Sequence, residues 1–237
     1  MGREQRPGNA DYEETTALVQ KLDALKQRGS NLLVVGSRMP DAHETACRQF
    51  LGETTTEARR RLFVLADTAR SSSDRPSLAT ADPDRHAVVR YDTAARSAAV
   101  TATNLATTPD AAPPTERATE NELGRLGTAI SEVVAEFEAT SGGLSAAELR
   151  LCFDSLTPLI SEHDPETVFR FLHLLTHRVR GVGGMGHYHL TADRSNRTVA
   201  LLEPLFDAVI ELCFRDGELY QRWYLHDGGL TTGWLQL

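Results

Sequence analysis

The order of apolar and polar residues along this chain follows two periods, which predict alternating helices and strands. Apolar residues that recur every three or four positions predict amphipathic helices, and short unbroken apolar runs predict strands buried on both faces. The predicted helices cover residues 11–29, 41–51, 123–137, 165–179 and 197–206. The predicted strands cover residues 31–36, 62–66, 86–103, 149–154, 185–190, 208–214 and 218–225, with 86–103 forming one or two strands.

Several boundaries of these elements carry specific signals. Asp41 and Glu44 have the spacing of a capping box, in which side chains bond the backbone amides at the start of a helix. Asp164 precedes Pro165, and an N-cap aspartate followed by proline is typical of a helix start. The Asp-Gly pair at 216–217 predicts a tight turn, so the last two strands should form an antiparallel hairpin.

The alternation of strands and helices indicates the α/β class. We expect three layers, with helices on both faces of a mainly parallel sheet and the antiparallel hairpin at its C-terminal side. Residues 1–29 should form an N-terminal helical segment, and residues 30–237 the α/β domain. Two stretches rich in loop-forming residues, at about 70–85 and 107–119, predict flexible connections.

Composition narrows the class of protein. The chain has 237 residues, of which 41% are hydrophobic and 24% charged, a balance typical of a globular protein. No apolar run approaches the ~20 residues that cross a bilayer, and no hydrophobic segment follows the N-terminal basic residues. We therefore expect a cytoplasmic protein without membrane association. The net charge of -8 also disfavours binding to a phosphate backbone through bulk charge.

Lysine and cysteine usage is also informative. Lys21 and Lys26 are the only lysines among 25 basic residues, and this acidic, arginine-rich composition resembles that of proteins from salt-loving archaea. Cys47, Cys152 and Cys213 lie far apart in apolar stretches, without the spacing of metal ligands or redox pairs. We expect all three to be buried, reduced thiols.

Two histidine pairs raise the question of a metal site. His173 and His177 lie four residues apart on a predicted helix, and His187 and His189 project to one side of a predicted strand. The first pair lacks the glutamate of the HExxH motif, and no cysteine or carboxylate joins the histidines at a known spacing. The prediction is therefore no metal site. We expect His173 and His177 to lie beside the face of their helix that packs on the sheet. We expect His187 or His189 to lie at the rim of the sheet on the nucleotide side.

Two further motifs bear on nucleotide binding. The strand at 149–154 ends in Asp154, and an aspartate at the carboxyl end of a buried strand can hold Mg²⁺ through water. The run at 181–186 matches GxGxxG, but it connects a predicted helix to a predicted strand. A dinucleotide loop makes the opposite connection, so we interpret the glycines as a helix C-cap and a tight entry into the sheet.

The run at 153–190, which begins FDSL and ends HYHL, resembles the Walker B half of RecA-superfamily proteins of the KaiC-like kind. More broadly, the chain is similar to an uncharacterised family of halophilic archaea related to these ATPases. The similarity covers roughly residues 30–215, on the strand ending at 36–37, Cys47, CFDSL, FRFLHLLTHRVR, HYHL and LFDAVIE. The resemblance implies a RecA-like fold and a role in signalling or regulation.

The phosphate-binding loop departs from this pattern. A Walker A loop reads GxxxxGK[ST], but from Gly36 onward this chain has Asp41 for glycine, Ala42 for lysine and His43 for the Mg²⁺-binding hydroxyl. No lysine follows Lys26 to replace it. Efficient ATP hydrolysis is therefore not expected, and no residue is assigned a catalytic role. The resemblance implies a remnant nucleotide pocket made of Gly36, Ser37, Arg38, Asp67, Asp154 and Ser155.

We therefore expect a regulatory or scaffold protein that acts through protein partners or self-association, needs no cofactor and binds nucleotide or Mg²⁺ weakly at most. The alternative is an unconventional Mg²⁺-dependent ATPase that uses Arg38, Asp67 and Asp154. A third hypothesis is DNA binding through the arginines at 59–61. Three adjacent basic residues just before a strand more often form a solvated edge. The aromatic hairpin at 219–224, with Trp234, could form an interface, although packing in the core is the commoner use.

Overall fold

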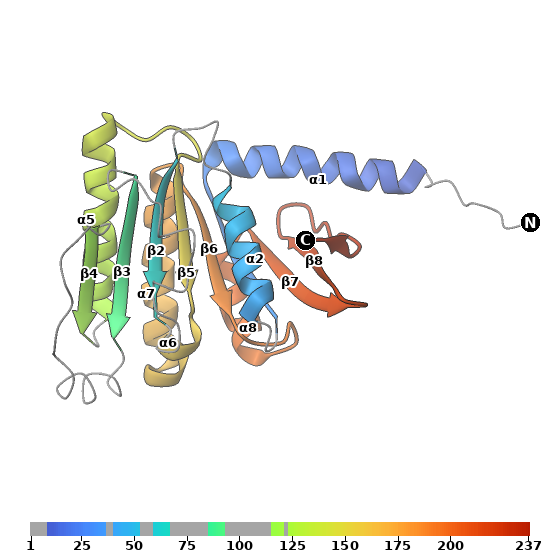
Figure 1. Cartoon of the computed structure of the whole chain (residues 1–237). Coiled ribbons are helices and arrows are strands. Elements are labelled where there is room, and N and C mark those ends of the chain that lie inside the picture. Colours follow the sequence, from blue (N-terminus) through green and yellow to red (C-terminus); the bar gives the residue numbers. More distant parts are fainter. Residues whose placement is uncertain (1–8, 37–39, 53–58, 67–84, 93–114, 121–122) are drawn as a thin grey trace, which may run out of the picture.

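The computed structural model describes residues 9–36, 40–52, 59–66, 85–92, 115–120 and 123–237. Within them, nine strands form one sheet in the order β4-β3-β2-β5-β6-β1-β7-β8-β9 (Figure 1). Neighbouring strands from β4 to β7 are parallel, and β8 and β9 add to β7 in antiparallel fashion. The strands are β1 (Ser30–Val35), β2 (Arg60–Leu65), β3 (His86–Asp92), β4 (Thr115–Glu120), β5 (Leu149–Asp154), β6 (Met185–Leu190), β7 (Ala208–Arg215), β8 (Glu218–Leu225) and β9 (Leu235–Gln236).

Helices cover both faces of the sheet. They are α1 (Asn9–Arg28), α2 (Pro40–Leu51), α5 (Leu123–Ser141), α6 (Thr157–Glu162), α7 (Pro165–Gly181) and α8 (Arg197–Leu202), followed by the 3-10 turn η2 (Glu203–Leu205). α2 packs on one face, and α5 and α7 pack on the other (Figure 1). Within the described segments, no helix combines the length and the apolar character that would let it cross a bilayer.

Strand β1 shows how the sequence builds the two sides of the core. Successive side chains of a strand point to opposite faces. Leu32 and Val34 therefore join the cluster formed with α1 and α2, whereas Leu33 and Val35 join the larger cluster under α5 and α7. All four side chains are buried, which explains why the strand has no polar alternation.

The structure confirms a mixed α/β fold with a mainly parallel sheet and an antiparallel C-terminal hairpin. One expectation was wrong. The C-terminal part of the connection predicted at 107–119 contains β4, which pairs with β3. The sequence of β4, TERATE, lacks an apolar pattern, so only backbone pairing at the edge of the sheet reveals it. The loop predicted at 70–85 lies almost wholly outside the described residues.

The glycine run that follows α7 behaves as predicted. It joins α7 to β6, and Gly183 has a φ of +64° at the turn. A Cβ on Gly184 would lie 2.9 Å from the Leu149 side chain and 3.1 Å from the Val179 carbonyl oxygen. The run is a helix C-cap and a close approach to β5, as the helix-to-strand order implied.

The aromatic side chains of the C-terminal hairpin divide between the core and the surface, since Trp223 is buried whereas Phe214 is 57% exposed. Trp223 is buried and stacks edge-on against Phe50 of α2. The hydroxyl of Tyr224 donates to Glu211 on the neighbouring strand, and Arg222 lies over the Trp234 ring. Of the two interpretations of this hairpin, the structure supports packing in the core for Trp223.

The three arginines at the start of β2 are engaged within the protein. Arg61 is 5% exposed and donates to the Gly52 carbonyl oxygen, and burial lowers its pKa. Arg60 pairs with Glu148 at 3.3 Å, with both side chains largely buried. The expectation of a solvated edge was wrong for Arg60 and Arg61, whose side chains are largely buried.

A buried polar contact ties three elements together beneath β1. The Asn31 side chain donates to the Thr176 carbonyl oxygen of α7 and accepts from the Tyr188 hydroxyl of β6. Its backbone amide donates to Asp207. Because buried polar groups without partners are costly, this network favours one register between β1, β6 and α7.

We predict that Tyr188→Phe destabilises the protein, because it leaves the buried side-chain oxygen Oδ1 of Asn31 without its donor. The expected loss is about 1–3 kcal/mol in the free energy of unfolding, measured by urea denaturation. Tyr220→Phe removes a hydroxyl that bonds Glu218 at the protein surface and should cause little change. Equal stability of the two variants would contradict the role given to Asn31.

Candidate functional site

The carboxyl ends of β1, β5 and β6 form the edge at which an α/β sheet ordinarily binds its ligand. The connection that leaves β1 passes through α2 on one face, while those that leave β5 and β6 pass through α7 and α8 on the other. Because β1 and β6 are neighbours, their connections diverge at this edge. Such a switch point opens a crevice beyond the strand ends.

Three residues of the predicted nucleotide pocket reach this edge. Gly36 directly follows β1, Asp154 is the last residue of β5, and Ser155 is buried just beyond it. The peptide bond between Asp154 and Ser155 is cis. β6 lies between β1 and β5, which separates their ends by roughly two strand spacings, or ~10 Å. Ser37, Arg38 and Asp67 lie outside the described residues.

The positions that replace the Walker A lysine and hydroxyl point inward. Ala42, in the first turn of α2, is fully buried and belongs to the core cluster under that helix. His43 is 6% exposed, and its side chain bonds atoms inside the protein. Neither position presents a cation or a hydroxyl to a ligand at the strand ends.

His43 links the end of β1 to β6. Its Nε2 lies 3.1 Å from the Gly36 carbonyl oxygen, and its Nδ1 lies 2.9 Å from Nδ1 of His189. A carbonyl oxygen only accepts, so Nε2 of His43 carries the proton and donates to it. When the His43 ring is neutral, its Nδ1 accepts from Nδ1–H of His189. The Nε2 atom of His189 is left with a lone pair.

Below this edge, four buried side chains bring together the atoms that bind transition metals. They are Cys47 of α2, Cys152 of β5, and His187 and His189 of β6. One ligand atom from each residue, a sulfur or a ring nitrogen, lies within 4.8 Å of the ligand atoms of the other three. The two sulfurs are 2.7 Å apart, without a disulfide between them. Cys213, by contrast, lies on β7 and is only half-buried.

The electrostatics of this cluster favour a thiolate at Cys152 and a neutral imidazole at His189. Burial opposes ionisation of Cys152, but the Cys47 thiol and the two imidazoles outweigh it, so the pKa of Cys152 lies well below its ordinary value. Burial lowers the pKa of His189 to about 4, although the Cys152 sulfur opposes this shift. Thiolate sulfur and neutral imidazole are the forms that bind metals.

Sequence spacing could not reveal the cluster. Cys152 and His187 are directly opposed in the register of β5 and β6, but that pairing depends on the order of strands in the sheet. Cys47 joins them only because α2 crosses this face. The one local signal was the alternation that puts His187 and His189 on one side of their strand. His173 and His177 are exposed on α7, on the opposite face.

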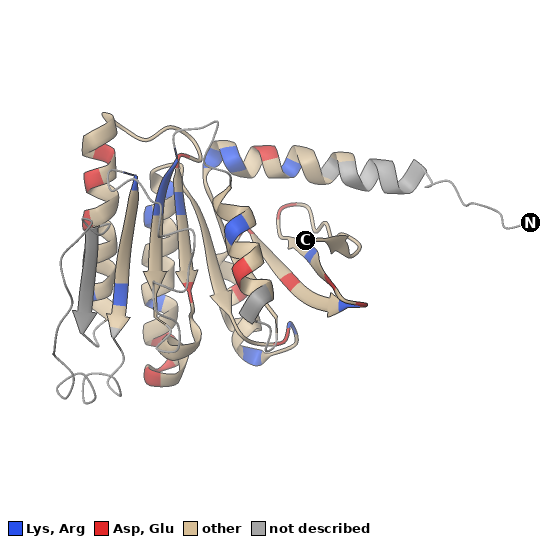
Figure 2. Cartoon of the chain, in the orientation of Figure 1, with Lys and Arg blue, Asp and Glu red and all other residues tan. Residues whose placement is uncertain are grey.

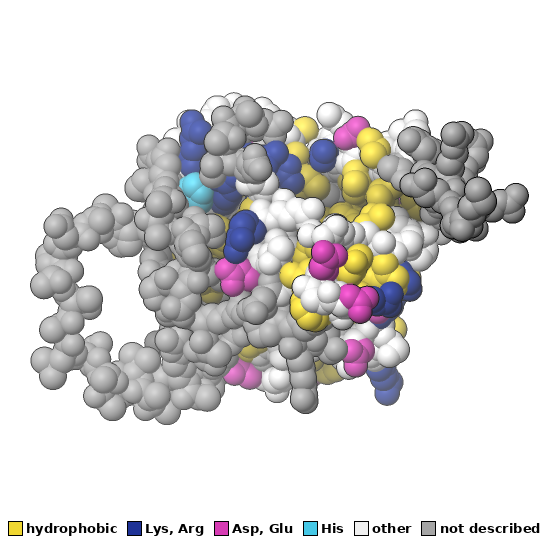
Figure 3. Space-filling model, turned by 45° about the vertical axis from the view of Figure 1, so that its right-hand side comes forward, with side chains coloured by type: hydrophobic (Ala, Val, Ile, Leu, Met, Phe, Trp, Pro, Cys, Tyr) yellow, Lys and Arg dark blue, Asp and Glu magenta, His cyan; other side chains and the backbone are white. Residues whose placement is uncertain are grey.

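Basic side chains gather at the other edge of the sheet. Lysine and arginine concentrate near the end of α1 and the starts of β2 and β5, at the top of Figures 2 and 3. Lys26, Arg59 and Arg150 line a cavity of about 370 Å³ there, together with Glu148. This positive charge lies at the amino ends of the strands, away from the predicted nucleotide pocket.

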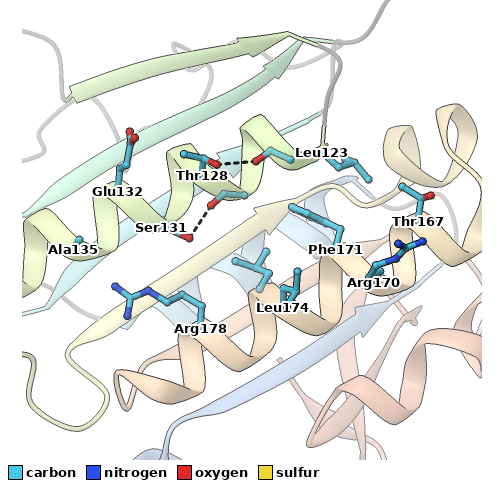
Figure 4. A pocket seen from close by; sticks show the side chains of 13 residues that line it. Leu123, Thr128, Ser131, Glu132, Ala135, Thr167, Arg170, Phe171, Leu174 and Arg178 are labelled. Atoms are coloured by element: carbon cyan, nitrogen blue, oxygen red, sulfur yellow. Dashed lines mark hydrogen bonds between the residues drawn. The ribbon is translucent and has the colours of Figure 1, made fainter.

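An apolar groove lies between α5 and α7, on the face opposite α2 (Figure 4). Its volume is about 700 Å³. Leu123, Phe171 and Leu174 contribute apolar side chains, and Leu174 is 66% exposed. The hydroxyls of Thr128 and Ser131 donate to backbone carbonyls one turn earlier (Figure 4). The groove thus offers few polar groups that lack partners.

Comparisons with known proteins place the chain in a family. Residues 29–212 match the family model described as Family of unknown function (DUF7504). The match covers most of the chain, so the protein belongs to this family. It includes β1, β5, β6 and all four residues of the buried cluster. A search of curated proteins finds no match to the chain.

We predict that Ala42→Lys fails to restore nucleotide binding and destabilises the protein. The side chain at position 42 faces the core, so an introduced ammonium would be buried without a partner. The expected loss is about 3 kcal/mol or more, measured by urea denaturation. Gln49→Lys adds the same charge to the exposed face of α2 and should be nearly neutral. Tight Mg·ATP binding by a fully stable Ala42→Lys protein would refute this placement.

Proposed function

We propose that the protein is a regulatory or scaffold module with a RecA-like sheet, which does not hydrolyse ATP efficiently and acts through protein contacts. The proposal depends on one observation: the side chain of α2 at the position of the Walker A lysine points into the core. Ala42 is fully buried there, and the neighbouring His43 bonds Gly36 and His189. The strand ends that would hold a nucleotide are kept, while the chemistry that would neutralise a triphosphate is lost.

The RecA-like assignment is supported by the layout of the sheet. β1 carries the degenerate loop, β5 ends in Asp154, and both strands reach the same edge. In P-loop proteins, a strand-end aspartate of this kind holds Mg²⁺ beside the phosphates. The resemblance of CFDSL to a Walker B strand agrees with this position. Membership of a family of unknown function leaves the activity open. The RecA-like assignment therefore depends only on the arrangement of β1 and β5 at this edge of the sheet.

Charge supports the absence of efficient hydrolysis. Phosphoryl transfer depends on cations that stabilise charge on the transferring group. The described lysines lie on α1, which ends at the amino edge of the sheet. A triphosphate at the carboxyl edge would meet Asp154 without a lysine beside β1.

The proposal predicts little or no ATP turnover. Isothermal titration with ATP, with and without Mg²⁺, should show weak binding or none, and phosphate release in high salt should stay at background. Asp154→Ala should leave both measurements unchanged. Mg²⁺-dependent turnover that Asp154→Ala abolishes would instead establish the alternative ATPase, with Arg38 and Asp67 as its other candidates.

The resemblance to RecA-like domains, which commonly pack side by side, implies that the partner is a second copy of this chain. The groove between α5 and α7 supplies the exposed apolar surface that such a contact requires. Arg170 and Arg178 at its border already pair with Glu166 and Glu138. Apolar contact at Leu174, rather than charge, would therefore supply most of the affinity.

Self-association through the groove is tested by Leu174→Glu. This change adds a charge at the 66% exposed Leu174 and should shift the wild-type oligomer to the monomer in sedimentation equilibrium. Leu201→Glu alters a 44% exposed leucine on α8, outside the groove, and should leave the oligomer intact. A monomeric wild-type protein, or equal behaviour of the two variants, would exclude this interface.

A further inference from the structure

We propose that Cys47, Cys152, His187 and His189 form a structural zinc site that fastens α2 to the sheet. This assignment does not depend on the proposed function. It starts from four metal-binding side chains that lie together in the core, and from two of their nitrogen atoms that lack hydrogen-bond partners.

The scaffold fixes three of the four side chains on one face of the sheet. His187 and His189 are two residues apart on β6, so both project toward α2. Cys152 is the register partner of His187 on the adjacent strand β5. Cys47 approaches from α2, where it packs with Cys152 and Phe63. Two neighbouring strands and the helix that covers them thus surround one point.

The imidazoles have nitrogen atoms available for an ion. His187 and His189 are 2% and 1% exposed, and neither Nε2 atom has a hydrogen-bond partner among the described residues. A buried polar atom without a partner is costly and calls for an explanation such as an ion. His43 holds the proton of His189 on Nδ1, so Nε2 presents its lone pair to the cluster.

The contact between His189 and His43 also matches a feature of metal-binding histidines. Such a histidine donates its second ring nitrogen to another group, which fixes the ring and its tautomer. His189 donates Nδ1–H to His43, which in turn donates to Gly36. His43 is therefore a positioning residue for the proposed ligand His189.

The donor set and its size select the ion. Two thiolates and two imidazoles at the corners of a tetrahedron are typical of zinc. Bonds of about 2.0–2.3 Å place tetrahedral ligand atoms about 3.3–3.8 Å apart. Rotations of side chains reach this from a cluster whose ligand atoms, one from each residue, all lie within 4.8 Å of one another. A Rieske-type cluster puts the cysteines and histidines on different irons, and these four side chains are too close for that.

Charge balance favours the same ion. In the bound state both sulfurs are thiolates, any thiol proton having passed to solvent, and two thiolates with two neutral imidazoles compensate the two positive charges of zinc. The buried site is then neutral overall, which avoids an uncompensated charge in the core. With four protein ligands, the ion has no open position for a substrate. It stabilises the fold and performs no reaction.

The first test uses the unmodified protein. Elemental analysis after purification without added metal should find about one zinc ion per chain. X-ray absorption at the zinc edge should show two sulfur atoms at about 2.3 Å and two nitrogen atoms at about 2.0–2.1 Å. Absence of zinc, with no uptake when zinc is added to the reduced protein, would overturn the proposal. So would iron or copper in the place of zinc.

The second test uses variants with matched controls. Cys152→Ser should lose the zinc, whereas Cys213→Ser removes a thiol outside the cluster and should keep it. His43→Ala should keep the zinc ligands but weaken zinc affinity by roughly 10–100-fold in a chelator competition. His163→Ala, distant from α2, is its control. Unchanged zinc content and affinity in Cys152→Ser and His43→Ala would refute the site.

The third test separates zinc from a disulfide, because the two sulfurs are already close. The protein is denatured with a chelator and an alkylating reagent, without reductant, and its mass is measured. Alkylation of all three cysteines supports the zinc site. Protection of Cys47 and Cys152 until a reductant is added would show a disulfide and overturn the proposal.

Discussion

Two imidazoles in an apolar interior impose the strictest constraint on this protein. His187 and His189 are 2% and 1% exposed, so bulk water does not reach their nitrogen atoms. Their neighbours must therefore satisfy these atoms. The His43 ring bonds Nδ1 of His189 on one side. The thiols of Cys47 and Cys152 lie close to the imidazoles on the other. The position of α2 over β5 and β6 depends on how these groups are matched.

The same constraint acts on the first turn of α2, which follows the proposed remnant of a Walker A loop. In a Walker A loop, the first turn of the following helix presents its lysine and hydroxyl to phosphates. Here the corresponding turn directs Ala42 and His43 into the core, where they serve packing and the contact with His189. The end of β1 thus contributes to internal structure at the place where a hydrolase would contact its substrate.

Much of the fold could be predicted from the sequence because its signals are local. Period and capping located α7 and both strands of the hairpin, and the buried run at β1 gave its two-sided packing. The edge strand β4 was missed because its polar sequence carries no periodic signal. The cluster was missed for a different reason: Cys47 and His189 meet only through the strand order, which no spacing encodes. Asp154 and Gly36 were correctly placed at strand ends, since that requires only the element boundaries.

The separation of the four cluster residues along the chain has a consequence for biosynthesis. Cys47 emerges from the ribosome early, and α2 can form soon afterwards, but β6 with its two histidines is made only after α7. Until β6 is made, the side of α2 that faces the sheet lacks part of the surface on which it packs. The nascent chain must keep two thiols reduced and shielded during that interval, so a shortened product that ends before residue 185 would expose them to oxidation and aggregation.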